Sequence, residues 1–195
     1  MPDRSVALDR DAMSRTLVRI AHEIIERNPP PDPAAHDAVA HPLAIVGIHR
    51  RGAVLAQRIH ALTSALAGVA IPLGSVDISF YRDDLGRRGG AAAPVVHATE
   101  LEFAVTGATI VIVDDVLYTG RTVRAAIDVL FDYGRPAAVQ LATLVDRGHR
   151  ELPIRPDFIG KNLPTAHNER VNVRVLEVDG SDEVAIIPAG ERVAG

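Results

Sequence analysis

The chain has 195 residues, 47% of them hydrophobic, which suits one well-buried domain and is short for two. It contains no cysteine, which excludes disulfide frameworks and thiolate chemistry, and no apolar run approaches the ~20 residues that span a bilayer. The net charge of −4 argues against indiscriminate coating of nucleic acid but permits a local basic face. The N-terminus lacks a signal-peptide pattern, so we expect a cytoplasmic protein with a single domain over residues 1–195 and no membrane partner.

The first half of the chain predicts an amphipathic helix and then the start of a β-α-β unit. Residues 9–28 place four large apolar side chains on one helical face, namely Met13, Leu17, Ile20 and Ile24. Prolines end this helix and predict an exposed, stiff loop over residues 28–42. The segments expected next are a buried strand over 43–48, a helix over about 52–66 and a more alternating stretch over about 71–80.

The second half predicts a loop, a buried strand and further strands. Residues 81–94 lack periodicity and are rich in glycine, which predicts a mobile loop that could act as a lid. Residues 109–113 form a β-branched run typical of a strand buried on both faces of a parallel sheet. The helix after this strand is expected to face the sheet with Val123, Ile127, Leu130 and Phe131. The remaining segments expected are a strand near 137–145, an irregular proline-rich section to His167, and strands over 171–178 and 183–188.

Two acidic residues and a turn of small residues follow the buried strand. Ligands of open α/β sheets bind at the carboxyl ends of strands, where Asp114 and Asp115 can accept hydrogen bonds from sugar hydroxyls. The turn Thr119-Gly120-Arg121-Thr122 offers N–H groups and hydroxyls to a phosphate at the start of a helix. Receiver domains place such an acidic pair after the first strand of a shorter chain, and no Gly-x-x-x-x-Gly-Lys-Ser/Thr is present for a P-loop. The pattern therefore favours a sugar-phosphate site over these alternatives or a plain surface turn.

The stretch from Asp114 to Arg124 closely resembles the 5-phosphoribosyl-1-pyrophosphate (PRPP) signature of type I phosphoribosyltransferases. The stretches Leu144 to Arg155 and Gly160 to Pro164 resemble further motifs of one branch of that family, and the resemblance runs from about Leu8 to about Ile187. It implies an α/β fold with a mainly parallel sheet of about five strands flanked by helices. A hood at about 146–170, drawn from the N- and C-terminal irregular parts, and the flexible loop at about 81–94 would cover the site.

The resemblance also implies which residues bind PRPP. In the family the acidic pair holds the ribose hydroxyls, and the turn after the first buried strand holds the pyrophosphate. Asp115 and Arg82 would be catalytic, Asp115 in proton transfer and Arg82 by stabilising the departing pyrophosphate from the flexible loop. Mg²⁺ would arrive on the PRPP oxygens with no direct protein ligand. The expected PRPP and UMP contacts are Arg50, Arg51, Gly52, Asp114, Asp115, Val116, Leu117, Tyr118, Thr119, Gly120, Arg121 and Thr122.

The resemblance further implies contacts to a base and to RNA. Three residues of the hood region would read uracil, namely Arg147, Lys161 and Val171. A basic surface would bind an mRNA leader hairpin through Arg15, Arg19, His22, His149, Arg150 and Arg155. From spacing alone, each of these residues fits equally well an ordinary structural turn or a solvated helix face.

Members of this branch regulate pyrimidine biosynthesis genes by binding RNA in response to UMP, UTP and PRPP. They also convert uracil and PRPP into UMP and pyrophosphate. The resemblance therefore implies a bifunctional RNA-binding regulator and uracil phosphoribosyltransferase that works as a homo-oligomer, either a dimer or a tetramer. Two other functions stay open, a nucleobase phosphoribosyltransferase without RNA regulation and an enzyme for another base such as a purine.

Overall fold

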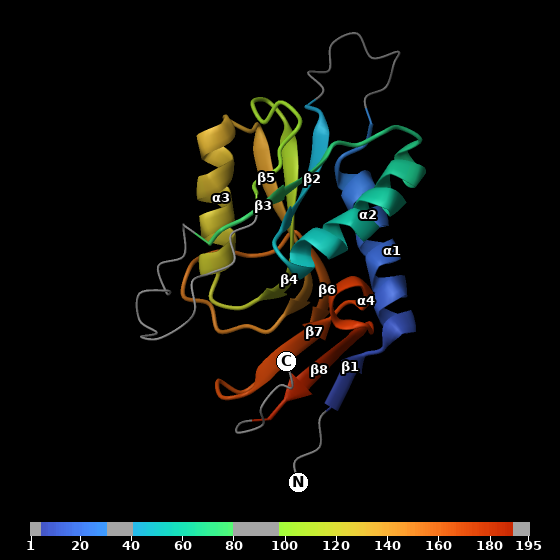
Figure 1. Cartoon of the computed structure of the whole chain (residues 1–195), viewed down its shortest axis with the longest axis vertical. Helices are drawn as coiled ribbons and strands as arrows, with labels where there is room; N and C mark the ends of the chain where they lie inside the picture. The colour runs from blue at the N-terminus through green and yellow to red at the C-terminus, as the bar shows by residue number, and fades with distance from the viewer. Residues whose placement is uncertain (1–4, 31–40, 80–97, 189–195) are drawn as a thin grey trace.

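A computed structural model describes residues 5–30, 41–79 and 98–188 of the chain (Figure 1). The predicted loop at 81–94, with Arg82, lies outside these residues, as does the middle of the proline-rich loop predicted at 28–42. No helix in the described part of the chain is long and apolar enough to cross a membrane.

The centre of the structure is a five-stranded parallel sheet with strand order β3-β2-β4-β5-β6. Its strands are β2 (Leu43–Ile48), β3 (Leu73–Val76), β4 (Thr109–Leu117), β5 (Ala138–Asp146) and β6 (Phe158–Asn162). Helices α1 (Arg10–Arg27) and α2 (Arg51–Ala67) cover one face, and α3 (Arg121–Tyr133) covers the other (Figure 1). This arrangement confirms the predicted fold class.

The apolar run of β4 is buried on both faces of this sheet, as predicted. Val111 and Val113 join the core beneath α1 and α2, whereas Ile110 and Ile112 join the core beneath α3. All four side chains are at most 1% exposed. Successive residues of a strand point to opposite faces, so a strand covered by helices on both sides needs apolar residues throughout rather than alternation.

Helix α1 follows the sequence prediction within one residue at each end. The Asp9 side chain caps it by accepting a hydrogen bond from the Ala12 N–H at 2.8 Å. The four predicted core residues, Met13, Leu17, Ile20 and Ile24, are at most 3% exposed. The helix is therefore fixed in the core by one face and presents Arg15, Arg19 and His22 on the other.

A second, antiparallel sheet lies beside the carboxyl ends of the main strands, with strand order β1-β8-β7 (Figure 1). It combines the N-terminal strand β1 (Ser5–Leu8) with β7 (Arg170–Arg174) and β8 (Glu183–Ile187), and the short helix α4 (Leu176–Asp179) connects the last two. The N- and C-terminal parts of the chain thus build one unit, and apart from Arg170 its strands come from outside residues 146–170, where the hood is expected.

Three sequence predictions about elements are wrong in detail. The section expected to be irregular up to His167 contains β6, which completes the main sheet, and the strand expected over 171–178 gives way to α4 after Arg174. Phe131 is 53% exposed, because α3 turns Ala125, Ala126 and Val129 toward the sheet instead. Small residues let this helix approach the sheet closely, which a count of large apolar residues does not reveal.

Strand β6 lies so close to its neighbours that Gly160 cannot gain a side chain. A Cβ there would stand 2.3 Å from the Leu144 carbonyl oxygen and 2.8 Å from Thr16 Cγ2 of α1. We expect Gly160→Ala to lower the free energy of unfolding by about 1–3 kcal/mol, the usual cost of overpacking, as measured by urea denaturation. The matched control is Asn162→Ala on the exposed part of the same strand, which should change it by less than about 0.5 kcal/mol. Equal losses in both variants would contradict this packing argument.

Candidate active site

The acidic pair lies near the end of β4, at the edge of the sheet where the carboxyl ends of the main strands meet. The predicted strand ends at Val113, but pairing with β5 continues to Leu117, which faces Asp146. Both carboxylates are therefore held by a strand rather than by a turn. Asp114 is 6% exposed, and Asp115 is half-buried.

Local hydrogen bonds fix both carboxylates. Asp114 Oδ1 accepts from the Asp115 N–H at 2.9 Å, and Asp115 Oδ1 accepts from the Val116 N–H at 2.8 Å. Burial raises the pKa of the Asp115 carboxyl, although the Val116 N–H and the charge of Arg51 act in the opposite direction. A carboxylate in this state is favoured to accept a proton or to bind hydroxyl donors and cations.

The turn after β4 has the geometry of an anion site. Gly120 stands at φ 93°, in the left-handed region, and α3 starts at the next residue without a side-chain cap. The Arg121 N–H lies 3.4 Å from the Thr119 hydroxyl oxygen. The start of a helix presents N–H groups and the positive end of its dipole, which is the geometry that the predicted phosphate site requires.

A second turn joins β2 to α2 and is pressed against the acidic pair. It contains the cis peptide bond between His49 and Arg50. A Cβ on Gly52 would stand 2.7 Å from the Val113 carbonyl oxygen and 3.2 Å from Asp114 Cα, so only glycine allows α2 to begin there. The structure thus brings the turn with Arg50, Arg51 and Gly52 to the acidic pair.

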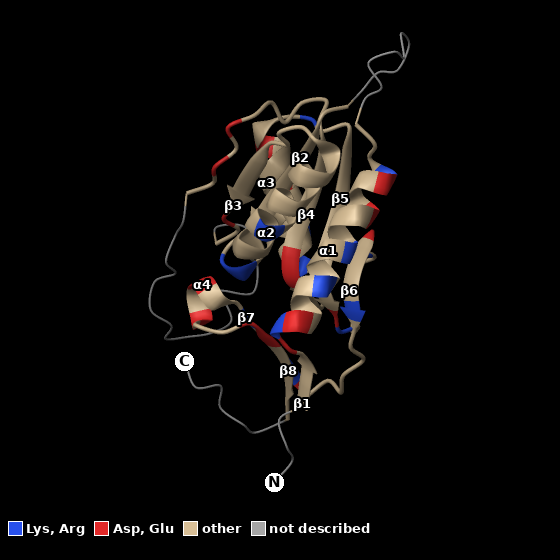
Figure 2. Cartoon of the chain, turned by 90° about the vertical axis from the view of Figure 1, so that its right-hand side faces the viewer, with Lys and Arg blue, Asp and Glu red and all other residues tan. Residues whose placement is uncertain are grey.

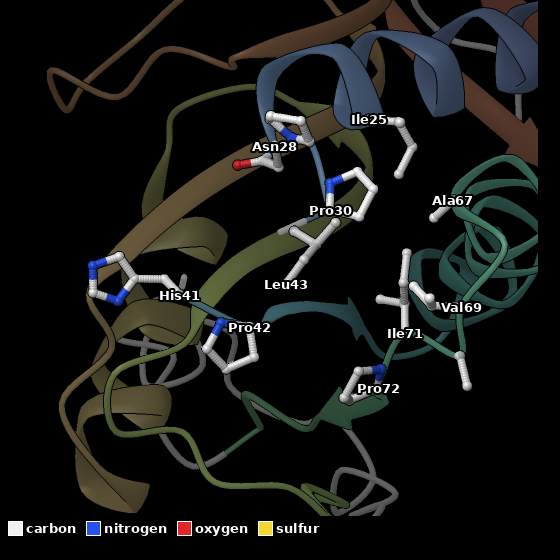
Figure 3. Close-up of a pocket in the computed structure, with 12 residues that line it drawn as sticks. Ile25, Asn28, Pro30, His41, Pro42, Leu43, Ala67, Val69, Ile71 and Pro72 are labelled. Atoms are coloured by element: carbon white, nitrogen blue, oxygen red, sulfur yellow. The ribbon is translucent and has the colours of Figure 1, made fainter. Parts of the chain in front are cut away.

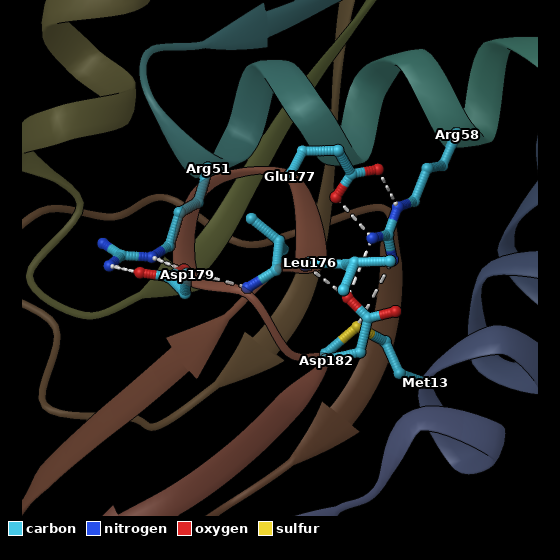
Figure 4. Close-up of polar contacts among 8 residues, drawn as sticks. Met13, Arg51, Arg58, Leu176, Glu177, Asp179 and Asp182 are labelled. Carbon is cyan, nitrogen blue, oxygen red and sulfur yellow. Dashed lines mark hydrogen bonds and ion pairs between the residues drawn. The ribbon is translucent and has the colours of Figure 1, made fainter.

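Arg51 has a partner that the sequence did not indicate. Its guanidinium donates two hydrogen bonds to Asp179 of α4, at 2.7 and 2.9 Å (Figure 4). This pairing raises the pKa of Arg51 and lowers that of the Asp179 carboxyl. The two residues are 128 positions apart, and no local pattern links them.

Arg147, expected to read uracil, is mostly buried and ties two loops together. Its guanidinium donates to the Thr165 hydroxyl at 3.1 Å and to the Glu169 carbonyl at 2.9 Å. It also stacks 4.2 Å from the ring centroid of Tyr118. Arg147 therefore connects the phosphate turn to the segment before β7.

The other two residues expected at the base have different neighbours. Lys161 donates to the Ala7 carbonyl at 2.8 Å and so fastens β6 to the N-terminal strand. Val171 is half-buried in β7, where it pairs with Ile186 of β8. Lys161 and Arg147 therefore contact different parts of the structure.

The residues expected to bind RNA fall into two groups. Arg15, Arg19 and His22 lie on the outer face of α1, which packs beside β6 (Figure 2). Arg19 donates to the carbonyls of Ile159 and Gly160 at 2.8 and 2.7 Å, so it also anchors this helix to the edge strand.

The second group lines an open groove of about 740 Å³ beyond the ends of β5 and β6. Its lining includes three arginines and a histidine, namely Arg147, Arg150, Arg155 and His149, together with the acidic Asp146. The centroid of the His149 ring lies 3.9 Å from that of His167, with the rings tilted by 49°, and His149 Nε2 lies 2.6 Å from the Thr165 carbonyl oxygen. Arg150 donates to the Tyr118 and Ile154 carbonyls, each at 2.9 Å, and forms an ion pair with Asp146. This basic surface is therefore braced by internal contacts.

An apolar pocket of about 400 Å³ opens at the opposite edge of the sheet, away from the acidic pair (Figure 3). It lies between the last turns of α1 and α2 and the start of β2, with Ile25, Ala67 and Leu43 among its lining residues. It contributes nothing to the site described above. Within the described ranges, no group of three or more His, Asp or Glu side chains could hold a metal ion by itself.

Comparisons with known proteins agree with this geometry. Residues 16–176 match the model of the phosphoribosyl transferase domain family. The chain is 56% identical over 181 residues to the bifunctional protein PyrR of Roseiflexus sp. (strain RS-1), covering 92% of this chain and 93% of the relative. It is 53% identical over 186 residues to the bifunctional protein PyrR of Brevibacillus brevis, covering 95% and 98%.

A solved structure supports the fold at much lower sequence identity. The hypoxanthine phosphoribosyltransferase of Trypanosoma cruzi superposes with a TM-score of 0.66 at 14% identity, covering 95% of this chain and 97% of that one. Both the predicted fold class and the predicted family are thus confirmed. The chain belongs to the type I phosphoribosyltransferase family and, within it, to the bifunctional PyrR proteins.

Proposed function

We propose that this protein converts uracil and PRPP into UMP and pyrophosphate, and that it binds the mRNA leader of pyrimidine biosynthesis genes in response to uridine nucleotides and PRPP. The main support is the meeting of three features at one sheet edge: the acidic pair, the phosphate turn and the turn that begins α2 at Gly52. A PRPP molecule carries a ribose, a 5′-phosphate and a pyrophosphate, which is one group for each of these three features. The proposal includes a cytoplasmic location and a homo-oligomer, either a dimer or a tetramer.

The proposed reaction is displacement at the anomeric carbon of PRPP. Asp114 and Asp115 would accept hydrogen bonds from the ribose hydroxyls and offset the positive charge that develops on the sugar. The turn at Thr119 to Thr122 would hold the 5′-phosphate, and Arg51 would face the leaving pyrophosphate. Mg²⁺ carried on the PRPP oxygens would neutralise part of the charge of that leaving group. Asp115, with its raised pKa, is the group best placed to accept a proton.

The regulatory half of the proposal rests on direct bonds between the phosphate turn and the basic groove. Arg150 donates to the Tyr118 carbonyl at 2.9 Å, and the N–H groups of Glu151 and Leu152 both donate to the Thr119 carbonyl, at 3.0 and 3.1 Å. A nucleotide phosphate that orders this turn would therefore also order Arg150, one of the residues that we assign to RNA, and the two residues that follow it. Such shared contacts favour a regulator over a plain phosphoribosyltransferase.

Asp115→Asn tests the site because it should lower the rate of UMP formation and at the same time raise the thermal stability. We expect the rate of UMP formation to fall at least about 100-fold, the size of effect seen when an acid–base group is lost. Burial raises the pKa of Asp115 in the folded chain above the ordinary pKa of a carboxyl. At a pH above that ordinary pKa, ionised Asp115 therefore lowers the free energy of unfolding. At a lower pH, where Asp115 is protonated in both the folded and the unfolded chain, this destabilisation is absent. Thermal unfolding at about pH 8 should thus occur at a higher temperature than in the wild type, with the gain shrinking toward about pH 4.

The matched control is Asp128→Asn, a carboxyl on α3 that is 53% exposed. It should leave both the turnover and the pH dependence of unfolding unchanged. An Asp115→Asn protein that keeps its turnover, or that gains no stability at high pH, would contradict the role given to this carboxyl.

Tyr118→Leu tests the link between nucleotide and RNA. The Tyr118 ring contacts both the Arg147 guanidinium and the edge of His149, with ring centroids of Tyr118 and His149 6.0 Å apart. We expect UMP to raise the affinity of the wild type for a leader hairpin transcript by about 5–150-fold, and Tyr118→Leu to bring this factor close to one. Filter binding with and without UMP measures it, and UMP binding with and without the hairpin must give the same factor.

Tyr133→Leu is the control for this experiment, since Tyr133 is 54% exposed at the end of α3. An unchanged factor in Tyr118→Leu would rule out coupling through the Tyr118 ring and its contacts to Arg147 and His149. So would an equal drop in Tyr133→Leu.

A further inference from the structure

Asp179 links the second sheet to the turn that we assign to pyrophosphate. Its carboxylate accepts from Arg51 Nε at 2.9 Å and from Nη2 at 2.7 Å, as two parallel hydrogen bonds (Figure 4). The Arg51 side chain is 36% exposed and that of Asp179 only 14%. A paired charge in a partly shielded place is stronger and more directional than an ion pair on the open surface.

Asp179 is itself held in place by two residues that precede it closely in the sequence. The oxygen that faces Arg51 Nε also accepts the Val175 N–H at 2.9 Å, and the Asp179 carbonyl accepts from Arg174 Nη2 at 2.9 Å. The first contact fixes the carboxylate and the second fixes the backbone of Asp179, both independently of Arg51. The pair therefore orients the long arginine side chain on a short, anchored carboxylate.

The position of α4 does not depend on Arg51 alone. Arg58, two turns further along α2, donates to Glu177 Oε1 and Oε2 at 3.0 and 2.6 Å and to Asp182 Oδ1 at 2.8 Å (Figure 4). Asp182 Oδ1 also accepts the Leu176 N–H at 2.8 Å. Helix α4 thus has a second attachment to α2, which lets the role of Asp179 be separated from the anchoring of the helix.

The pairing uses one edge of the Arg51 guanidinium. A guanidinium is planar and has a second edge, formed by Nη1 and Nη2, that can bind another anion in the same fork geometry. Asp179 and a phosphate group can therefore contact Arg51 together. Building on the function proposed above, we propose that Asp179 is a positioning residue that holds this second edge of Arg51 toward the pyrophosphate of PRPP.

Asp179→Asn in the full chain tests the proposal, because it removes the charge and the two-point contact while keeping the size of the side chain. Calorimetry would measure binding of pyrophosphate with Mg²⁺ and, separately, of UMP, which has the 5′-phosphate but no pyrophosphate. We expect pyrophosphate to bind about tenfold more weakly, the loss of roughly one charge-assisted hydrogen bond, and UMP to change by less than about twofold. The KM for PRPP should rise accordingly, while the KM for uracil should not.

The control variant is Glu177→Gln, which weakens the other attachment of α4 and should change neither affinity by more than about twofold. Equal weakening of pyrophosphate and UMP by Asp179→Asn, or the same loss of pyrophosphate binding in Glu177→Gln, would show that α4 acts only as a support. Tighter pyrophosphate binding by Asp179→Asn would show that Asp179 competes with the ligand. Either result overturns the proposal.

This experiment also separates the inference from the function on which it rests, since pyrophosphate binding is read without turnover. A wild type that binds pyrophosphate but forms no UMP contradicts the proposed function alone. A wild type that forms UMP, beside an Asp179→Asn variant that binds pyrophosphate normally, contradicts only the role of Asp179.

Discussion

The close approach of α2 to the end of β4 is the constraint on which the site depends. Gly52 lies where any Cβ would collide with the Val113 carbonyl, so the helix can begin directly beside Asp114 only because this residue has no side chain. The approach places a cationic turn next to two carboxylates that β4 holds rigidly. A sugar with a phosphate at one end and a pyrophosphate at the other needs this arrangement of charge.

The second sheet completes what the main sheet begins. Two arginines on one side of α2, Arg51 and Arg58, both pair with carboxylates from the region of α4. On the other side of the site, Arg147 and Arg150 bind the loops around Tyr118. These four arginines therefore tie together segments that are distant in the sequence, and two of them attach the region of α4 to α2.

The sequence predicted the parts whose signal is local. The strand Leu43–Ile48 was predicted at its observed bounds, α1 within one residue of its ends, and the turn that opens α3 from the order of strand, acidic pair and small residues. Strand β6 escaped prediction because its two apolar residues, Phe158 and Ile159, are followed by a glycine and two exposed polar residues, which is too short an apolar pattern to mark a strand; the strand is completed by pairing with β5. Elements whose stability comes from a neighbour cannot be found from their own residues.

Side-chain partners were predictable to a lesser degree. Arg51, Arg147 and Arg150 were expected to face ligands, yet each makes several bonds within the protein, often to backbone carbonyls. Carbonyl acceptors leave no trace in a sequence, because every residue has one. Asp179 was missed for a related reason, since only the fold brings it to a turn 128 residues earlier.

Transfer of a phosphoribosyl group to uracil at this sheet edge can be measured directly. The purified chain is incubated with Mg²⁺, PRPP and each nucleobase in turn, and pyrophosphate release is followed together with nucleotide formation. We expect UMP from uracil and no nucleotide from the purine bases. Turnover with a purine alone would contradict the assigned substrate, and no turnover with any base would contradict the enzyme itself.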